Sequence, residues 1–247
     1  MDDGGLGDSG TGRDVPLIET IAEISRRVSR ALLKSSEPLK EVKLVAVSKT
    51  FPVEKISEAL NAGLFMFGEN RVHELVSKFE QLRNKKIEWH FIGHLQTNKV
   101  KKLLEVPTKY IHSLDRLELG IELDRQLQKR GESREVLVEV NTSGEASKGG
   151  VQPESAAELV RAIARFESLK IKGLMTIGAL TDESELVRGC FKKLRELFRR
   201  IRAEGIDKVE MVELSMGMSG DFEIAVEEGA TVIRIGSAIF GDRPKAN

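Results

Sequence analysis

Lys49 is the residue with the clearest capacity for covalent chemistry in this chain of 247 residues. It follows Val42-Lys-Leu-Val-Ala-Val47, a mostly apolar run of strand length that suits a strand buried on both faces. Ligands bind at the carboxyl ends of such strands, in barrels and in open α/β sheets alike. An amine that loses solvation there can act as a nucleophile and form a Schiff base. The alternative is a lysine that extends from a strand end into solvent.

Serine and glycine gather near two later strand ends. Ser219 closes the segment Ser215-Met-Gly-Met-Ser219, just before a predicted helix, and Gly236-Ser237 follows the apolar run Val232-Ile-Arg-Ile235. Backbone N–H groups, small hydroxyls and a helix start are the groups that cradle a phosphate in the last loops of α/β barrels. The alternative is that these residues only form turns.

Arg234 lies two residues before Gly236 and therefore points to the same side of its strand, into the barrel or its mouth. A buried arginine needs an acceptor. Two kinds of acceptor are possible. One is an internal carboxylate such as Glu139 or Glu213, and the other is a ring nitrogen or an anionic group of a ligand. A lysine amine, a phosphate cradle and an arginine for a ring nitrogen are together the groups that pyridoxal phosphate (PLP) requires.

Other polar residues also follow predicted strands. We expect Asn70, His94 and Asn141 at the same mouth as Lys49. His90 and His94 are spaced as metal ligands can be, but they flank a strand end with no third ligand nearby in the sequence, so no metal site is predicted. Lys148, in a glycine-rich loop, either clamps a ligand or lies in a solvated turn.

The elements that must position these residues repeat one unit, a short apolar strand followed by an amphipathic helix. Pro16 opens an extra helix before the first strand, with Asp14 as its cap and an apolar face that includes Ile18 and Ile24. The strands are predicted at 42–48, 64–67, 89–92, 110–113, 136–140, 171–177, 209–214 and 232–235. The helices that follow them are predicted at 53–61, 72–84, 98–105, 115–130 (with Asp115 as cap), 153–167, 184–203 and 221–228.

Eight alternating strands and helices predict an α/β fold, a single-domain (β/α)₈ TIM barrel with an extra N-terminal helix. A doubly wound open sheet is the alternative. We expect residues 14–247 to form the barrel. Residues 1–13, which are rich in glycine and aspartate, are predicted to be a disordered tail.

Composition excludes several classes of partner. Lysine plus arginine total 39 and aspartate plus glutamate total 39, so no field of one sign favours nucleic acid. No apolar run approaches the roughly 18 residues of a membrane span. The lone Cys190, in a chain without a recognisable signal peptide, predicts a reducing, cytoplasmic location.

Six motifs carry a resemblance to a known family over residues 41–241. They are Ala46-Val-Ser-Lys-Thr50, Phe67-Gly-Glu-Asn-Arg71, Trp89-His-Phe-Ile-Gly93, Asn141-Thr-Ser-Gly-Glu145 with Ser147-Lys-Gly-Gly150, Ser215-Met-Gly-Met-Ser219 and Val232-Ile-Arg-Ile-Gly236. Together they resemble the pyridoxal phosphate homeostasis protein family, also called proline synthase co-transcribed homologue. The barrel of that family is similar to the N-terminal barrel of alanine racemase. His94 stands where proline or asparagine is common in the family, and Ser237 where threonine is common.

The resemblance implies a PLP site with no catalytic residue. Lys49 would hold the cofactor as a Schiff base, Asn70 would lie beside its ring, Arg234 would face the pyridine nitrogen, and Ser219, Gly236 and Ser237 would bind the phosphate. An arginine cannot protonate the ring nitrogen as an aspartate would, so carbanion chemistry is restrained.

The resemblance implies a non-catalytic PLP homeostasis protein that buffers the cofactor and delivers it to PLP-dependent apoenzymes, as a monomer or weak homodimer. The alternative is an amino-acid racemase or related PLP enzyme with weak activity. A racemase needs a second base. Tyr110 is the only tyrosine and is placed at the start of a predicted strand, at the wrong end of the barrel, and no β domain is predicted. These features favour the carrier.

Overall fold

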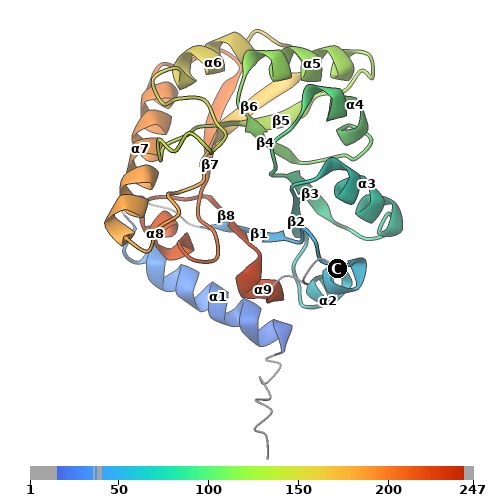
Figure 1. The fold of residues 1–247 in the computed structure, drawn as a ribbon, viewed down its shortest axis with the longest axis vertical. Coiled ribbons are helices and arrows are strands. Elements are labelled where there is room, and N and C mark those ends of the chain that lie inside the picture. Colours follow the sequence, from blue (N-terminus) through green and yellow to red (C-terminus); the bar gives the residue numbers. More distant parts are fainter. Residues whose placement is uncertain (1–15, 36, 38–40, 242–247) are drawn as a thin grey trace, which may run out of the picture.

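Eight parallel strands form a closed barrel in the computed structural model, which describes residues 16–35, 37 and 41–241. The strands follow one another around the barrel in sequence order, and a ring of helices surrounds them (Figure 1). The predicted (β/α)₈ barrel is therefore confirmed, and the doubly wound sheet is wrong. The tail predicted at 1–13 and the cap predicted at Asp14 lie outside the described residues.

The barrel strands are short and mostly buried, as the apolar runs predicted. Closure comes from the pairing of the first strand with the last, in a register that runs from Lys43 opposite Val232 to Ala46 opposite Ile235. The strands are β1 (Lys43–Val47), β2 (Met66–Glu69), β3 (Glu88–Phe91), β4 (Tyr110–Leu114), β5 (Arg134–Glu139), β6 (Leu169–Met175), β7 (Val209–Ser215) and β8 (Val232–Ile235).

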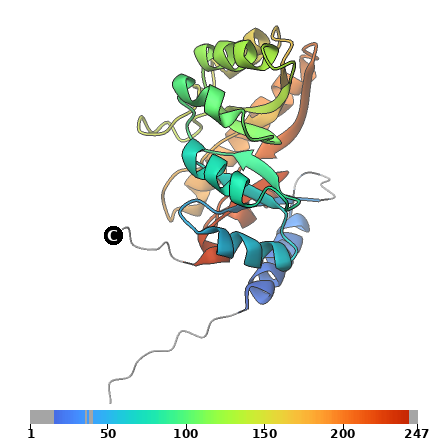
Figure 2. The same ribbon diagram turned by 90° about the vertical axis from the view of Figure 1, so that its right-hand side faces the viewer.

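The helices cover the outside of the barrel and bury their apolar faces against the strands. Side views show this layer in profile (Figure 2). The helices are α2 (Val53–Asn61), α3 (Val72–Gln81), α4 (Val100–Leu103), α5 (Leu117–Gln128), α6 (Ala156–Ile163), α7 (Ser184–Ala203), α8 (Phe222–Glu227) and α9 (Ser237–Phe240), with a 3₁₀ turn, η1 (Thr97–Lys99), before α4. Among the described residues, no helix is both long enough and apolar enough to cross a bilayer.

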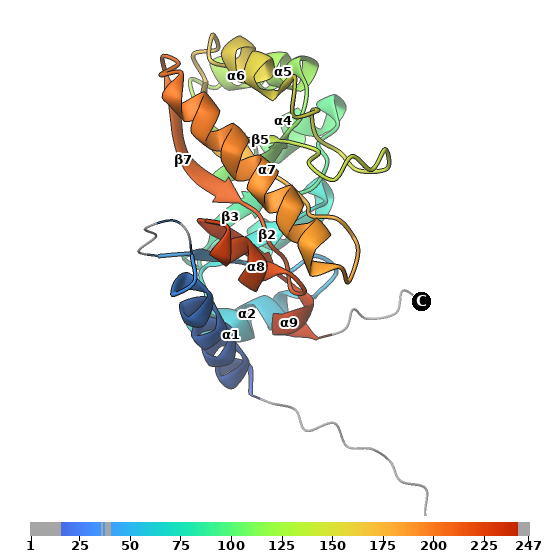
Figure 3. The ribbon, with the colours of Figure 1, turned by 90° about the vertical axis from the view of Figure 1, so that its left-hand side faces the viewer.

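The extra N-terminal helix α1 (Leu17–Leu32) is confirmed and packs against α8, α9 and α2 (Figure 3). Ile24 and Ala31 are its buried side chains, but Ile18 is 62% exposed, so its predicted place on the apolar face is wrong. Because α1 contacts the helices on both sides of the β8–β1 closure, it covers the seam at which the two ends of the sheet meet.

Two kinds of core lie in this barrel. The larger core lies between the strands and the helices and is apolar, with Phe67, Phe91 and Phe191 fully buried. The barrel interior combines a small apolar cluster that includes Leu137 and Met175 with buried polar and charged side chains. Parallel barrels usually fill this space with branched apolar residues. Each buried polar side chain in the barrel interior therefore needs a hydrogen-bond partner.

Some predicted boundaries are wrong. β2 lies two residues later than the prediction of 64–67, and the helix predicted at 98–105 is only η1 and α4. Asp115 does not cap α5; Arg116 is the N-cap residue, and its guanidinium pairs with the Asp115 carboxylate at 2.5 Å. α9 was not predicted, because Ser237–Phe240 is too short to show a helical period.

Candidate functional site

A cavity of about 510 Å³ lies at the carboxyl ends of the strands. Every residue that the sequence predicted as a site residue lines it, namely Lys49, Asn70, Ser219, Arg234, Gly236 and Ser237. Its volume lies in the range of sites that hold a small cofactor, roughly 300 to 1,000 Å³. The six residues come from four different strand ends, and the barrel closure brings them together.

Lys49 lies in a turn that directly follows β1. The Phe51 N–H donates to the Ser48 carbonyl at 3.1 Å, which closes the turn around the lysine. Thr50 has a φ of 68°, a left-handed conformation that is rare for a β-branched residue. Its N–H donates to Glu74 Oε2 at 3.0 Å, and this bond holds the strained backbone in place. The direction in which the Lys49 side chain leaves the backbone is therefore fixed by its neighbour.

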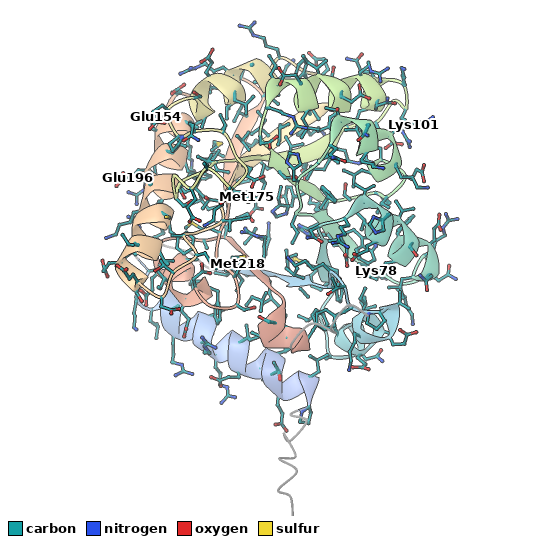
Figure 4. All side chains as sticks on the ribbon, in the orientation of Figure 1. Lys78, Lys101, Glu154, Met175, Glu196 and Met218 are labelled. Atoms are coloured by element: carbon teal, nitrogen blue, oxygen red, sulfur yellow. The ribbon has the colours of Figure 1, made fainter. Side chains whose placement is uncertain are left out.

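A buried ion pair between Lys78 and Glu69 holds the start of this turn at Ser48. Lys78 Nζ lies 2.8 Å from the Ser48 carbonyl and 2.7 Å from Glu69 Oε1, which also accepts from the Ser48 hydroxyl. Burial raises the pKa of Glu69, and the Lys78 ammonium opposes that rise. Lys78 is labelled on α3 in Figure 4. The sequence did not predict this pair, because Lys78 falls on a helical pattern where a solvent-facing lysine is the norm.

Arg234 is 4% exposed and reaches the cavity from β8. One terminal nitrogen donates to Ser215 Oγ at 2.6 Å, and the other donates to the Thr176 carbonyl at 2.8 Å. Burial lowers the pKa of Arg234 to about 10, against the opposing charges of Asp221 and Glu139. The guanidinium therefore remains cationic at neutral pH.

Glu213, one of the two internal carboxylates considered as a partner for Arg234, has other partners. It accepts from the Tyr110 hydroxyl at 3.1 Å and from Thr231 at 2.7 Å, and it pairs with Lys43. Arg234 is held instead by a hydroxyl and a carbonyl at the ends of β7 and β6. Neutral acceptors fix its position, and among the described residues no carboxylate forms a direct ion pair with it.

Ser219 and the β8–α9 corner form one polar edge of the cavity. The Ser219 hydroxyl accepts from the N–H groups of Gly236 and Ala238 at 3.3 and 3.2 Å. A Cβ on Gly236 would lie 3.3 Å from the Val47 carbonyl, closer than side chains normally approach, so glycine lets the ends of β8 and β1 meet. Backbone N–H groups beside small hydroxyls are the donors that suit a phosphate group.

Asn70 is placed at the cavity by a close backbone approach. A Cβ on Gly93 would lie 2.1 Å from the Asn70 carbonyl oxygen, so only glycine permits this contact. Ile92 and His94, on either side of Gly93, line the cavity with Asn70. His94 stays 61% exposed, and its Nδ1 lies 3.4 Å from Asp115.

Some lining residues were not predicted as part of the site. Glu139 is among them, and burial followed by the nearby Asp115 charge raises its pKa to about 7, while Arg234 opposes the rise. Met218 and Gly149 also line the cavity, and Figure 4 shows Met218 toward the centre of the ring. Glu139 lies next to the end of the strand predicted at 136–140, so its position near a strand end was the signal that could have found it.

Two loop residues lie elsewhere than predicted. Asn141 does not face the mouth; its side chain donates to the Glu145 carbonyl at 2.9 Å and accepts from the Gly144 N–H, so it shapes its own loop. Lys148 donates to the Gly178 carbonyl at 2.6 Å and pairs with Glu145. Lys148 therefore ties two loops together and does not lie in a solvated turn.

His90 and His94 do not come together. His90 is fully buried in the barrel interior, whereas His94 is at the mouth. Within the ranges that the structure describes, no group of three or more histidine, cysteine, aspartate or glutamate side chains could hold a metal ion.

The comparisons with known proteins agree with this geometry. Residues 23–244 match the family of the alanine racemase N-terminal domain. The alanine racemase of Clostridium difficile 630 shares the fold at 15% identity with a TM-score of 0.69, covering 93% of this chain and 56% of the racemase chain. The fold and the cavity thus define a barrel of the alanine racemase N-terminal class.

Within this class, the chain belongs to the pyridoxal phosphate homeostasis protein family. The Aquifex aeolicus protein of that name is 44% identical over 225 residues, which are 91% of this chain and 97% of the relative. The Bos taurus protein of the same name is 43% identical, over 89% of this chain and 85% of the relative. PipY of Synechococcus elongatus PCC7942, solved with PLP bound, is 32% identical with a TM-score of 0.78, covering 91% of this chain and all of PipY.

Proposed function

We propose that this protein binds PLP in the cavity at the barrel mouth and acts in PLP homeostasis as a non-catalytic carrier. One observation carries the proposal: Lys49, Arg234 and the Ser219 corner, which come from distant parts of the sequence, line one cavity. Family membership and the PLP-bound structure of PipY support it.

The residues present fit the cofactor. The cavity offers an amine at Lys49, a buried cation at Arg234, and hydroxyl and backbone donors at the corner of Ser219 and Ser237. These are the groups that an aldehyde, a pyridine nitrogen and a phosphate need. Gly236 lines the cavity beside this corner, and its N–H is one of the backbone donors there.

Each residue has one role in this proposal. PLP supplies an aldehyde that bonds covalently to an amine, and Lys49 provides that amine. Arg234 would donate a hydrogen bond toward the ring nitrogen and leave it unprotonated, because a guanidinium with a pKa of about 10 keeps its protons at neutral pH. Ser219, Gly236 and Ser237 bind the phosphate, and Asn70 lies beside the ring.

The carrier function is favoured over a racemase by the place of the only tyrosine. Tyr110 begins β4, at the end of the barrel opposite the cavity, and its hydroxyl donates to Glu213. Burial and the Glu213 charge raise the pKa of Tyr110 far above its ordinary value, so its hydroxyl stays protonated and no phenolate is available to accept a proton. A racemase needs a base on each face of the substrate, and Tyr110 cannot be the second one.

The same proposal includes the partners and the compartment. A protein that holds PLP without turnover can pass it to PLP-dependent apoenzymes, which are the proposed recipients. The single cysteine, Cys190, is a buried free thiol and fits a reducing compartment such as the cytoplasm.

The first test is spectroscopic. Purified protein incubated with PLP is expected to show the visible absorption band of a lysine-bound cofactor, and Lys49→Ala is expected to abolish it. Lys55→Ala is the matched control and should keep the band. It removes an exposed lysine that pairs with Glu58 in α2. A wild-type protein without the band, or a band that survives in Lys49→Ala, would contradict the proposal.

The second test separates the carrier from the enzyme. The PLP-loaded protein is incubated with L-alanine in deuterated water, and in parallel with a PLP-dependent apoenzyme. We expect recovery of apoenzyme activity without deuterium entering the α position of alanine. Exchange of that hydrogen at a rate that depends on Lys49 would show an enzyme instead.

A further inference from the structure

A chain of hydrogen bonds runs through the barrel interior from Arg234 to the opposite end. Arg234 donates to Ser215 Oγ at 2.6 Å, and Ser215 Oγ lies 2.9 Å from His112 Nδ1. His112 Nε2 lies 2.9 Å from His90 Nδ1, and His90 Nε2 lies 3.1 Å from Glu88 Oε1. We name these five residues the axial chain.

The axial chain is enclosed by the barrel. His90, His112 and Ser215 have no exposed surface, and Arg234 is 4% exposed. Glu88 is the most exposed member, with 31% of its side chain open to solvent. Glu88 begins β3 and lines a second cavity of about 480 Å³ at the amino ends of the strands. The chain therefore joins the candidate cofactor cavity to the other face of the barrel.

The two ends of the axial chain set the direction of its bonds. A guanidinium only donates and a carboxylate only accepts. The bond from His90 lowers the pKa of Glu88, against the opposing effect of burial, so Glu88 is ionised at neutral pH. His90 Nε2 must then carry a hydrogen.

The hydrogens in between follow from the same rule. Burial, with the charge of Arg234, lowers the pKa of His112 well below its ordinary value, so its ring is neutral and has one N–H. With Nε2–H on both histidines, His112 donates to His90, and Ser215 donates its hydroxyl hydrogen to His112 Nδ1. The Ser215 oxygen then turns its lone pairs to Arg234. Each member of the axial chain then donates one hydrogen bond to the next member, from Arg234 to Glu88.

We propose that Ser215 and His112 are positioning residues for the ring-facing Arg234, and that the axial chain, oriented from Arg234 toward Glu88, fixes this guanidinium at the cofactor site. The proposal rests on the proposed function only for the identity of the ring that Arg234 faces. Chains of this kind polarise one another in a low-dielectric interior, so the loss of a distant member weakens the acceptor at Ser215.

The orientation is tested on the protein without cofactor. Nitrogen-15 NMR of labelled histidine reports which ring nitrogen carries hydrogen. We expect His90 and His112 both to be protonated at Nε2 and bare at Nδ1. A cationic His90 would reverse the His90–His112 and His112–Ser215 hydrogen bonds and place a hydrogen on His112 Nδ1. That result would overturn the proposed direction. This measurement stands whether or not the protein binds PLP.

The positioning role is tested on the protein loaded with PLP. Ser215→Ala and His112→Phe each break the axial chain, and we expect both to raise the PLP dissociation constant about tenfold and to shift the visible band. His112→Gln is expected to restore the wild-type band, because its amide can accept from Ser215 and donate to His90. Tyr110→Phe is the matched control, since it removes a buried hydroxyl of the barrel interior that bonds to Glu213 instead.

The outcomes separate the two proposals. If wild-type protein shows no visible band, the proposed function fails, and the NMR result alone decides the orientation of the axial chain. If wild type and Tyr110→Phe show the band and the two chain-breaking variants match them, the positioning role is overturned while PLP binding stands. His112→Gln behaving like His112→Phe, with both folded by circular dichroism, would also overturn it.

Discussion

Glu139 is the carboxylic acid that ends β5 at the wall of the cavity, and its acid–base behaviour is altered by its surroundings. Burial and the charge of Asp115 raise its pKa to about 7, and Arg234 limits the rise. A glutamate with such a pKa is protonated in part at neutral pH. The cavity therefore gains a negative charge as the pH rises through 7, next to the place proposed for an anionic cofactor.

This carboxyl group makes stability depend on pH. The folded protein holds the Glu139 proton up to about pH 7, whereas the ordinary value is 4.5, so the folded state binds more protons between these values. Stability should fall as the pH rises through this window, by up to about 3 kcal/mol from this group. Glu139→Gln should flatten that part of the profile.

Urea unfolding between pH 5 and 8 checks this prediction. Glu54→Gln, at an exposed position of α2, is the control and should leave the wild-type slope unchanged. If Glu139→Gln keeps the same slope as wild type, Glu139 is not the group that responds.

Glycine at the strand ends decides how closely the elements can approach. Gly93 follows β3 and allows its backbone to touch the carbonyl of Asn70, after β2. Gly189 lies in the middle of α7 at an exposed position, with no neighbouring atom within 4 Å of the place of a Cβ. The two glycines therefore predict opposite effects of one added methyl group.

Gly93→Ala should destabilise the protein by about 3 kcal/mol or more, because the added Cβ would lie 2.1 Å from the Asn70 carbonyl oxygen. It should also weaken PLP binding, since Asn70 must move. Gly189→Ala should stabilise the protein by roughly 0.5 to 1 kcal/mol through helix propensity. Denaturant unfolding of both variants measures these changes, and equal effects would contradict the predicted contact.

The periodic elements could be predicted from the sequence, and the polar interior could not. α2, α7 and β8 have the predicted bounds, because their apolar spacing is regular and glycine or proline marks their ends. The strand predicted at 64–67 ended too early, because the last residues of β2, Gly68 and Glu69, are types that are common in turns. Glu69 is buried only because Ser48 and Lys78 supply its hydrogen bonds, and such partners are not visible in one sequence.

The residues that line the candidate site were predicted better than the residues that hold them in position. Lys49, Arg234 and Ser219 could be found because strand ends of a barrel share one rim. Thr50, whose backbone is strained, and Ser215, which holds Arg234, could not be found in this way. Their roles depend on φ angles and on side chains that meet inside the barrel.

At the scale of the whole molecule, the cavity spans the seam where the barrel closes. Lys49 follows β1 and Arg234 belongs to β8, and these two strands pair with each other. A ligand that contacts both therefore binds the closed barrel and not the unfolded chain. Such binding stabilises the folded state by mass action.

Saturating PLP is accordingly expected to raise the melting temperature. At about 100 times the dissociation constant the gain is about 2.7 kcal/mol, which corresponds to about 5 to 10 °C for a domain of this size. Scanning fluorimetry with and without PLP measures the shift. Lys49→Ala should lose most of it, and an equal shift in that variant would mean that PLP stabilises the protein from another site.

The pairing of β1 with β8 also has a consequence for the newborn chain. Arg234 is made 185 residues after Lys49 (234 − 49 = 185). At about 5 to 20 residues per second, roughly 10 to 40 s separate the two. During that interval the lysine has neither its arginine nor the serine corner beside it, so a growing chain lacks the complete site that we propose for capture of the aldehyde. Cofactor loading is thus a step that follows synthesis, and a loaded molecule is one whose last strand is in place.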